Sequence, residues 1–102
     1  MGLDKGMAST QDYLNYILDL LKLTTGISVK TMMGEYLLYK DGLLFGGIYD
    51  NRFLVKKTKS SIELGLQEQI PYQSAKPMLL VDSENPEEIR RLVDGVYRDL
   101  RD

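Results

Sequence analysis

Residues 35–57 have the sequence EYLLYKDGLLFGGIYDNRFLVKK, and this stretch decides the fold of the chain. Two pairs within it, Asp41-Gly42 and Asp50-Asn51, are of the kind that forms two-residue β-hairpin turns, and β-prone runs flank both pairs. The pattern predicts a three-stranded antiparallel meander. Because two-residue turns determine which residues lie opposite each other, the turns also predict the register of the strands.

Side-chain alternation along the meander predicts two sheet faces. The face predicted to join the core carries Leu37, Tyr39, Leu44, Gly46, Ile48, Phe53 and Val55. The other face is nearly as apolar but includes three cations, and it is the predicted interaction face: Tyr36, Leu38, Lys40, Phe45, Gly47, Tyr49, Arg52, Leu54 and Lys56. An exposed apolar surface of this kind is typical of a protein–protein or homodimer interface. Gly46 and Gly47 lie in mid-strand, where glycine predicts a bulge or a close backbone approach.

Helical patterns flank the meander on both sides. Apolar residues recur at helical spacing over residues 10–23, where Ser9 or Thr10 is the predicted N-cap and Gly26 the predicted terminator. Residues 85–102 form a second amphipathic pattern, which Asn85 caps and in which Pro86 takes the first helical position.

Two shorter signals lie between the meander and the last helix. Ser60 and Glu63 have the spacing of a capping box, which predicts a short helix ending near Gly65. Residues 78–81, an apolar run without alternation, predict a strand inside the sheet. The predicted fold class is therefore α+β and two-layered, with a meander of three to four strands, one later strand, a helix at each end and a short middle helix.

Length and composition set the domain organisation. At 102 residues the chain is long enough for one domain, predicted over residues 9–102, and residues 1–8 read as a leader or an expression remnant. No apolar run reaches the roughly 20 residues that a membrane-spanning helix needs. We expect a cytoplasmic protein, because the chain contains no cysteine and so no disulfide framework.

The sequence also contains no histidine. Without cysteine or histidine the chain lacks the usual ligands of zinc, copper and haem, the common catalytic nucleophile–base pairs, and the commonest general base near neutral pH. The turn carboxylates Asp41 and Asp50 lie at opposite ends of one predicted strand, roughly 30 Å apart at about 3.3 Å per residue, which is too far for shared chemistry. We therefore expect no enzymatic activity, no cofactor and no metal, and a magnesium or calcium site made of carboxylates alone is the alternative that stays open.

The middle of the chain resembles the N-terminal domain of the TfoX/Sxy family of bacterial competence regulators. The resemblance rests on MGEYLLY at residues 33–39, DG at 41–42, FGGIYD at 45–50 and FLVK at 53–56, and it extends over nearly all of residues 9–102. The family-like motif residues that we single out are Met33, Gly34, Tyr36, Tyr39, Asp41 and Gly42.

The resemblance implies a fold similar to the secretion chaperones, in which helices cover one face of an antiparallel sheet. It also implies a regulatory role: two-domain members of the family act as transcriptional co-activators through protein contacts with the cyclic-AMP receptor protein. Since this chain matches only the first domain of those regulators, the implied function is that of a stand-alone interaction module, with a transcription factor as a candidate partner.

Three alternative interpretations remain open at this stage. Tyr36, Phe45 and Tyr49 with the nearby cations could stack on single-stranded nucleic acid, although a pI near 5.1 makes direct nucleic-acid binding the less favoured interpretation. Met32-Met33 is interpreted as core filling beside a turn, with an adaptable binding surface as the alternative. The basic run at residues 56–59 is interpreted as a solvated strand end, with an anion or acidic-segment site as the alternative.

Overall fold

One antiparallel sheet of six strands organises residues 8–102, the part of the chain that this computed structural model describes. The elements follow in the order α1 (Gln11–Leu20), β1 (Ile27–Met32), β2 (Glu35–Lys40), β3 (Leu43–Ile48), β4 (Phe53–Val55), α2 (Lys59–Ile62), β5 (Glu68–Gln69), β6 (Met78–Leu80) and α3 (Pro86–Arg101). The strand order across the sheet is β1-β2-β3-β4-β6-β5. The predicted α+β class is confirmed, and β6 lies inside the sheet as predicted.

Tight turns connect the first four strands. Asp41-Gly42 and Asp50-Asn51 form the two predicted hairpin turns, and all four residues have φ between +48° and +83°, as turns of type I′ require. A third turn of the same kind, Met33-Gly34, joins β1 to β2. The meander therefore begins one strand earlier than residues 35–57 alone predict.

A β-bulge lies between β2 and β3, beside the mid-strand glycines. Leu38 pairs with Gly46 and Tyr39 pairs with Leu44, so Phe45 is an extra residue on β3. A Cβ on Gly46 would lie 2.3 Å from the carbonyl oxygen of Leu54, closer than any side chain tolerates. Both the bulge and the close backbone approach predicted at these glycines are thus confirmed.

The bulge makes the predicted division of the sheet into faces wrong. A regular register would place Leu38 opposite Phe45, but beyond the bulge Tyr36 lies opposite Ile48 and Leu38 opposite Gly46. Residues that lie opposite each other share a face, so Tyr36 and Leu38 lie on the face of Ile48, and the predicted core residues Leu37 and Tyr39 lie on the other.

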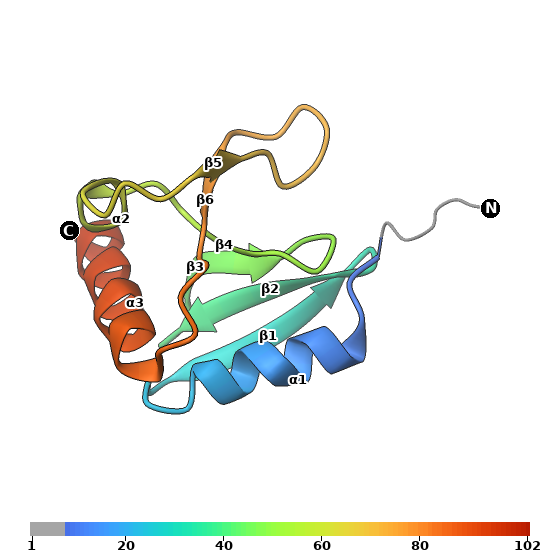
Figure 1. Cartoon of the computed structure of the whole chain (residues 1–102), viewed down its shortest axis with the longest axis horizontal. Coiled ribbons are helices and arrows are strands. Elements are labelled where there is room, and N and C mark those ends of the chain that lie inside the picture. The colour runs from blue at the N-terminus through green and yellow to red at the C-terminus, as the bar shows by residue number, and fades with distance from the viewer. Residues whose placement is uncertain (1–7) are drawn as a thin grey trace.

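The core lies between the Leu38 face of the sheet and the helices. Phe45, Leu38, Ile48, Phe53 and Val55 are at most 1% exposed and pack with apolar residues of α1 and α3, so Leu38 and Phe45 are core residues and not part of an open interface. Figure 1 shows α1 along one side of the sheet and α3 across one end of it, with α2 beside α3.

The helix boundaries differ in detail from their prediction. Thr10 is the N-cap of α1, but the helix ends at Leu20, and Gly26, with φ of +77°, turns the chain into β1 instead of ending the helix. The capping box of α2 starts at Thr58, whose backbone N–H donates to Ser61 Oγ, and not at Ser60.

The prediction for α3 is confirmed, since the Asn85 side chain accepts hydrogen bonds from the backbone of Glu87 and Glu88 and Pro86 opens the helix. None of the helices in residues 8–102 is long and apolar enough to cross a membrane. The predicted leader, apart from Ala8, lies outside the described residues.

Candidate binding site

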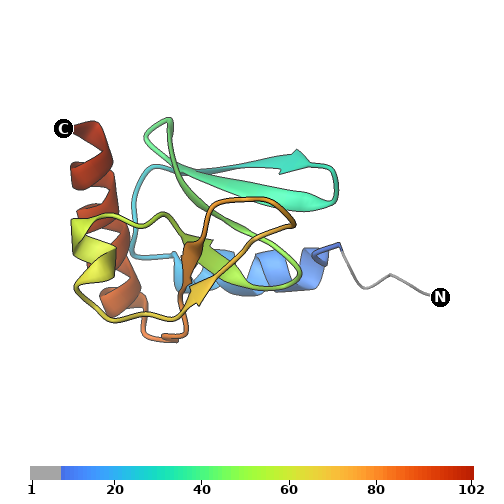
Figure 2. The ribbon, with the colours of Figure 1, turned by 90° about the horizontal axis from the view of Figure 1, so that it is seen from above.

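A pocket of about 660 Å³ opens on the sheet face that points away from the helices. Alternation along the strands puts Leu44, Tyr49, Lys56 and Met78 on this face. The loop between β5 and β6 arches over the sheet, as the view from above in Figure 2 shows. This loop supplies five further lining residues, and Gly46 of β3 and Lys57, which follows β4, complete the lining. The lining, which we call the lysine pocket, consists of Leu44, Gly46, Tyr49, Lys56, Lys57, Pro71, Tyr72, Ala75, Lys76, Pro77 and Met78.

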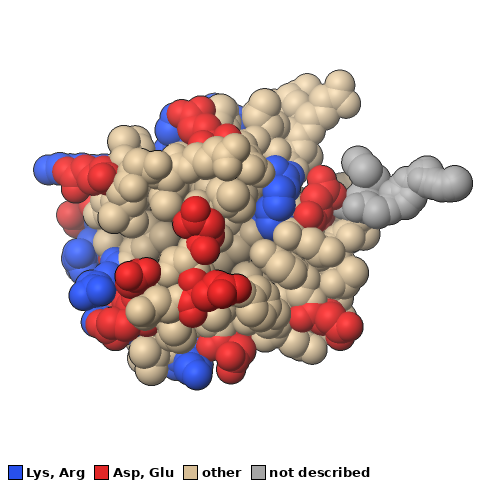
Figure 3. All heavy atoms as spheres, viewed as in Figure 1, with Lys and Arg blue, Asp and Glu red and all other residues tan. Residues whose placement is uncertain are grey.

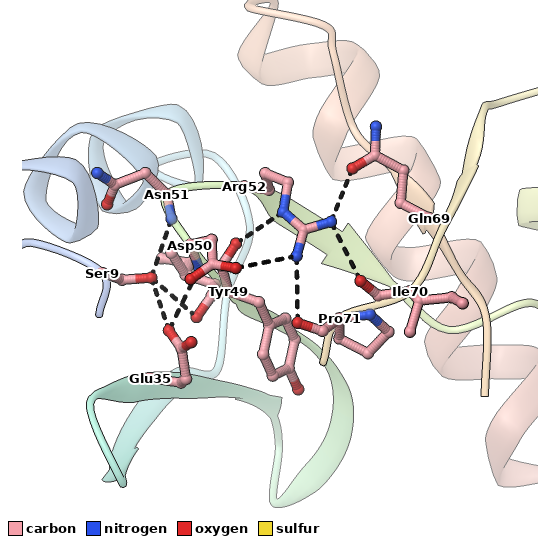
Figure 4. A network of polar contacts seen from close by, with 10 residues as sticks. Ser9, Glu35, Tyr49, Asp50, Asn51, Arg52, Gln69, Ile70 and Pro71 are labelled. Carbon is pink, nitrogen blue, oxygen red and sulfur yellow. Dashed lines mark hydrogen bonds and ion pairs between the residues drawn. The ribbon is translucent and has the colours of Figure 1, made fainter. Parts of the chain in front are cut away.

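Arg52 fastens the start of this loop to the sheet. Its guanidinium donates to Gln69 Oε1 at 2.8 Å, to the carbonyl oxygen of Ile70 at 3.2 Å and to that of Pro71 at 3.1 Å. Its Nε donates to the carbonyl oxygen of Tyr49 at 3.0 Å. These contacts occupy all three nitrogens of the guanidinium, so Arg52 positions one wall of the pocket (Figure 4).

A second group of polar contacts holds the start of α1 beside the same turn. Ser9 Oγ donates to Glu35 Oε1 at 2.8 Å and accepts the Asn51 backbone N–H at 3.1 Å. The Asp50 backbone N–H donates to the same Glu35 oxygen, and Asn51 Oδ1 accepts the Thr10 backbone N–H at 2.9 Å. Figure 4 shows the carboxylate of Glu35 and the guanidinium of Arg52 on opposite sides of the Asp50-Asn51 turn, which both groups stabilise.

Two tyrosines form the aromatic part of the lysine pocket. The rings of Tyr49 and Tyr72 are 6.0 Å apart between centroids and inclined at 51°, a favourable tilted arrangement. Tyr49 is only 6% exposed, whereas Tyr72 on the loop is 58% exposed. Burial raises the pKa of the Tyr49 hydroxyl, and the nearby Tyr72 and Glu35 raise it further. Tyr49 is therefore a neutral hydrogen-bonding group at the inner end of the aromatic wall.

The charge of the pocket is entirely positive. Lys56, Lys57 and Lys76 line it, and none of its lining residues is acidic, although the chain as a whole carries a formal charge of −2. Lys57 Nζ lies 2.5 Å from Glu68 Oε2, which neutralises one of the three cations. In the view of Figure 3, acidic side chains are scattered over the surface and basic ones gather mainly at one edge. The pocket thus groups cations in a protein whose net charge is negative.

The structure divides the predicted interaction face among three environments. Leu38, Phe45 and Lys40 are buried on the helix side of the sheet, Tyr36 is half-buried there, and Gly47 and Leu54 are buried on the opposite side. Arg52 holds the start of the loop between β5 and β6, and of the predicted face only the side chains of Tyr49 and Lys56 line the pocket.

Lys40 does not contribute to an exposed surface. Its ammonium donates to the Thr25 carbonyl oxygen at 2.7 Å and lies 3.5 Å from Asp94 of α3. It therefore joins the end of the β2–β3 hairpin to the α1–β1 connection and to α3.

The residues of the family-like motif also lie in several different environments. Met33-Gly34 and Asp41-Gly42 form turns, and Tyr39, on the face away from the helices, receives the ammonium of Lys30 over its ring. The prediction that Met32 and Met33 fill the core is wrong, because they are 48% and 95% exposed. They are exposed because they occupy the end of β1 and the tip of its hairpin.

Sequence reasoning missed the loop that completes the pocket. Tyr72 and Lys76 lie in a segment without a periodic pattern, and nothing in their spacing shows that the chain folds back over β3 and β4. The basic run was the available signal, since the lysines at positions 56 and 57 both line the pocket while Lys59 begins α2.

Two other features of the molecule bear on possible sites. An apolar hollow of about 530 Å³ lies between α2, α3 and the segment after β6, with Leu64, Leu66, Ile89 and Leu92 among its lining residues. Within residues 8–102, no group of three or more acidic side chains is arranged to hold a metal ion. The lysine pocket remains the site with the most distinctive chemistry.

No protein-family model matches the chain, and no curated protein sequence is significantly similar to it. The chemistry of the lysine pocket is therefore the basis for a functional proposal.

Proposed function

We propose that the protein is a non-enzymatic regulatory interaction module that binds an acidic segment of a protein partner in the lysine pocket. The observation that carries this proposal is the lining itself: three lysines, two tyrosines and several apolar side chains, with no acidic residue. In a protein whose net charge is negative, such a concentration of cations favours an anionic ligand.

The shape and polarity of the pocket favour a segment with mixed side chains. Leu44, Met78 and the ring of Tyr72 offer apolar surface, while Lys56 and Lys76 offer charge at the same opening. A segment in which carboxylates alternate with aromatic or aliphatic residues would match both properties. Aromatic and apolar contacts supply most of the affinity in such interfaces, and the charges supply specificity and a faster encounter.

The resemblance to the TfoX/Sxy N-terminal domain supports the regulatory part of the proposal. Members of that family act on transcription through protein contacts, which fits a module with a binding pocket. A transcription factor with an acidic, apolar segment is accordingly the partner class that we propose.

Single-stranded nucleic acid is the weaker candidate ligand. Stacking of bases requires exposed aromatic faces. Phe45 is fully buried and Tyr49 is 6% exposed, so two of the three rings on which that alternative depended are inaccessible. Tyr72 alone offers an exposed ring at the pocket.

A peptide titration tests the proposal directly. The probe is a short synthetic peptide in which glutamate alternates with leucine and phenylalanine, and binding is followed by calorimetry and by amide chemical shifts. We expect saturable binding with shift changes at Tyr49, Tyr72 and Met78. The double variant Lys56→Glu/Lys76→Glu should weaken binding by roughly 5- to 30-fold, since each reversed charge changes the binding free energy by about 0.5–1 kcal/mol.

A matched variant separates the pocket from net charge. Lys22→Glu/Lys59→Glu makes the same change in net charge at two exposed lysines outside the pocket lining, and it should retain nearly full affinity. Equal losses in both double variants, or no binding of the peptide, would refute the proposal. Tighter binding of a single-stranded oligonucleotide, with an affinity that falls steeply with salt, would favour the nucleic-acid alternative.

A further inference from the structure

The sheet has one long free edge. β1 is an outer strand of six residues that pairs with β2 on one side only, whereas the opposite outer strand, β5, has two residues. Figure 2 shows the β1–β2 hairpin along the margin of the molecule, and no other element of residues 8–102 pairs with its outer side. An unpaired edge of this length is a template for another strand.

The register of the hairpin shows which backbone groups face outward. Met32 and Glu35 flank the two-residue turn and form a hydrogen-bonded pair, so every second residue of β1 directs its N–H and C=O toward β2. The bond from the Asp41 N–H to the Gly26 carbonyl oxygen, 2.8 Å long, agrees with this alternation. The remaining residues, Ile27, Val29 and Thr31, direct three N–H and three C=O groups to the free edge.

We propose that a second copy of this chain pairs with β1 in antiparallel fashion, about a two-fold axis at Val29. In this register Val29 lies opposite Val29 of the second copy and Ile27 lies opposite its Thr31. All six outward backbone groups are then hydrogen-bonded. Each of these hydrogen-bonded pairs consists of β-branched residues, which pack well opposite each other in sheets.

The side chains of the edge are compatible with self-pairing. Ile27 and Val29 are half-buried against the core, and a neighbouring strand would cover more of their apolar surface. Lys30 is the one charged residue of β1, and it lies opposite Ser28 of the second copy, so no like charges meet across the seam. Natural edges are commonly protected by proline, a bulge or several charges, and within β1 only this single lysine is present.

This inference is independent of the proposed function, because none of the residues of β1 lines the lysine pocket. It predicts a symmetric dimer whose two sheets join through the β1 strands.

Charge substitutions at Ser28 test the register. Ser28 is exposed, so Ser28→Lys and Ser28→Glu should both fold. In the proposed dimer, each substitution puts a charge opposite Lys30 of the other copy, and the two-fold symmetry makes this contact occur twice. We expect Ser28→Lys to weaken the dimer and Ser28→Glu to strengthen it, each by roughly 2- to 30-fold in dissociation constant.

The assay is sedimentation equilibrium at protein concentrations from about 10 μM to about 1 mM, a range that brackets weak dimers. Val29→Pro provides a second variant: it removes an outward N–H without removing a bond of the β1–β2 ladder, and it should abolish the dimer while circular dichroism stays native. A wild-type monomer over the whole range would overturn the proposal. So would a dimer whose dissociation constant shifts in the same direction with both charges at Ser28.

Discussion

Replacement of Lys40 by methionine tests whether a buried ammonium joins three parts of the fold. The side chain of Lys40 is 8% exposed, and its Nζ lies 2.7 Å from the Thr25 carbonyl oxygen and 3.5 Å from Asp94 Oδ1. Nζ also lies 5.6 Å from the centroid of the Tyr97 ring. Methionine has a similar volume and keeps the apolar stem, so the substitution removes the charge and its hydrogen bonds with little change in packing.

Opposing contributions determine the size of the effect. Loss of a charge-assisted hydrogen bond and its ion pair costs about 1.5–3 kcal/mol, while the methionine avoids the cost of burying an ammonium. Asp94 keeps its ion pair with Arg90 at 3.2 Å and is 27% exposed, so it does not become an isolated buried charge. We therefore expect a net loss of about 1–2 kcal/mol in the free energy of unfolding, or roughly 4–15 °C in melting temperature.

Urea denaturation and thermal melting of Lys40→Met measure the two quantities. Lys30→Met is the matched control, because Lys30 lies on the neighbouring strand with its ammonium 5.4 Å from the Tyr39 ring centroid but is exposed. That control should change stability by less than about 0.5 kcal/mol. Because the Lys40 contacts are buried, the difference between the two variants should persist at about 1 M salt.

The result that would refute this reasoning is a Lys40→Met protein as stable as the wild type or more stable. Such a result would mean that desolvation of the ammonium outweighs its bonds to Thr25 and Asp94. A double-mutant cycle with Asp94→Asn then isolates the Asp94 contact: a coupling energy near zero would assign any loss to the other contacts of Lys40, chiefly the Thr25 hydrogen bonds.

Three further predictions test other parts of the structure. Gly46→Ala places a Cβ 2.3 Å from a backbone oxygen of the next strand and should lower the free energy of unfolding, measured in urea, by about 3 kcal/mol or more. Gly42→Ala is strained only by its φ of +83° and should lower it by about 1–2 kcal/mol. Equal losses in the two variants would contradict the close approach at Gly46. Burial raises the pKa of Tyr49 above 10.0, so the folded state gives up this proton less readily than the unfolded state does. Stability should therefore fall as the pH rises through 10.0 and beyond, and Tyr49→Phe should reduce that fall. An unchanged dependence of stability on alkaline pH would count against the burial effect. The N–H of Ser60 donates to Asp99 Oδ2 at 2.8 Å and lowers the pKa of Asp99 below 3.8. The stability that this contact provides above that pH should therefore be lost as acid protonates the carboxylate, and Asp99→Asn should lose less stability on acidification. A dependence of stability on acid pH like that of the wild type would exclude this contribution.

Local signals in the sequence were sufficient to predict two of the three hairpin turns and the last helix. Asp41-Gly42 and Asp50-Asn51 specify their turns through residues that accept positive φ, and the Asn85 cap with Pro86 specifies the start of α3. These features depend on contacts between residues close in the chain, which is why pattern reasoning finds them.

The faces of the sheet could not be predicted in the same way. The glycines at positions 46 and 47 indicated a bulge, but not whether the extra residue precedes or follows them. A shift of one residue moves a side chain to the opposite face, so the position of Phe45 decides where Tyr36 and Leu38 lie. One unpredicted residue was therefore enough to place Tyr36, Leu38 and Phe45 of the predicted interaction face on the core side of the sheet.

The number of helices explains why the molecule offers a pocket on one face of its sheet. α1 and α3 cover the Leu38 face, and α2 packs on α3, so the described helices leave the other face to the loop between β5 and β6. A loop covers a sheet less completely than a helix does, and Arg52 fixes only the start of this one. The hollow that remains is bounded by the strand end that carries Lys56 and by the part of the loop that carries Lys76. The lysine pocket therefore follows from the way a short chain covers a six-stranded sheet, and its charge, which this geometry does not require, is the property that points to an acidic partner.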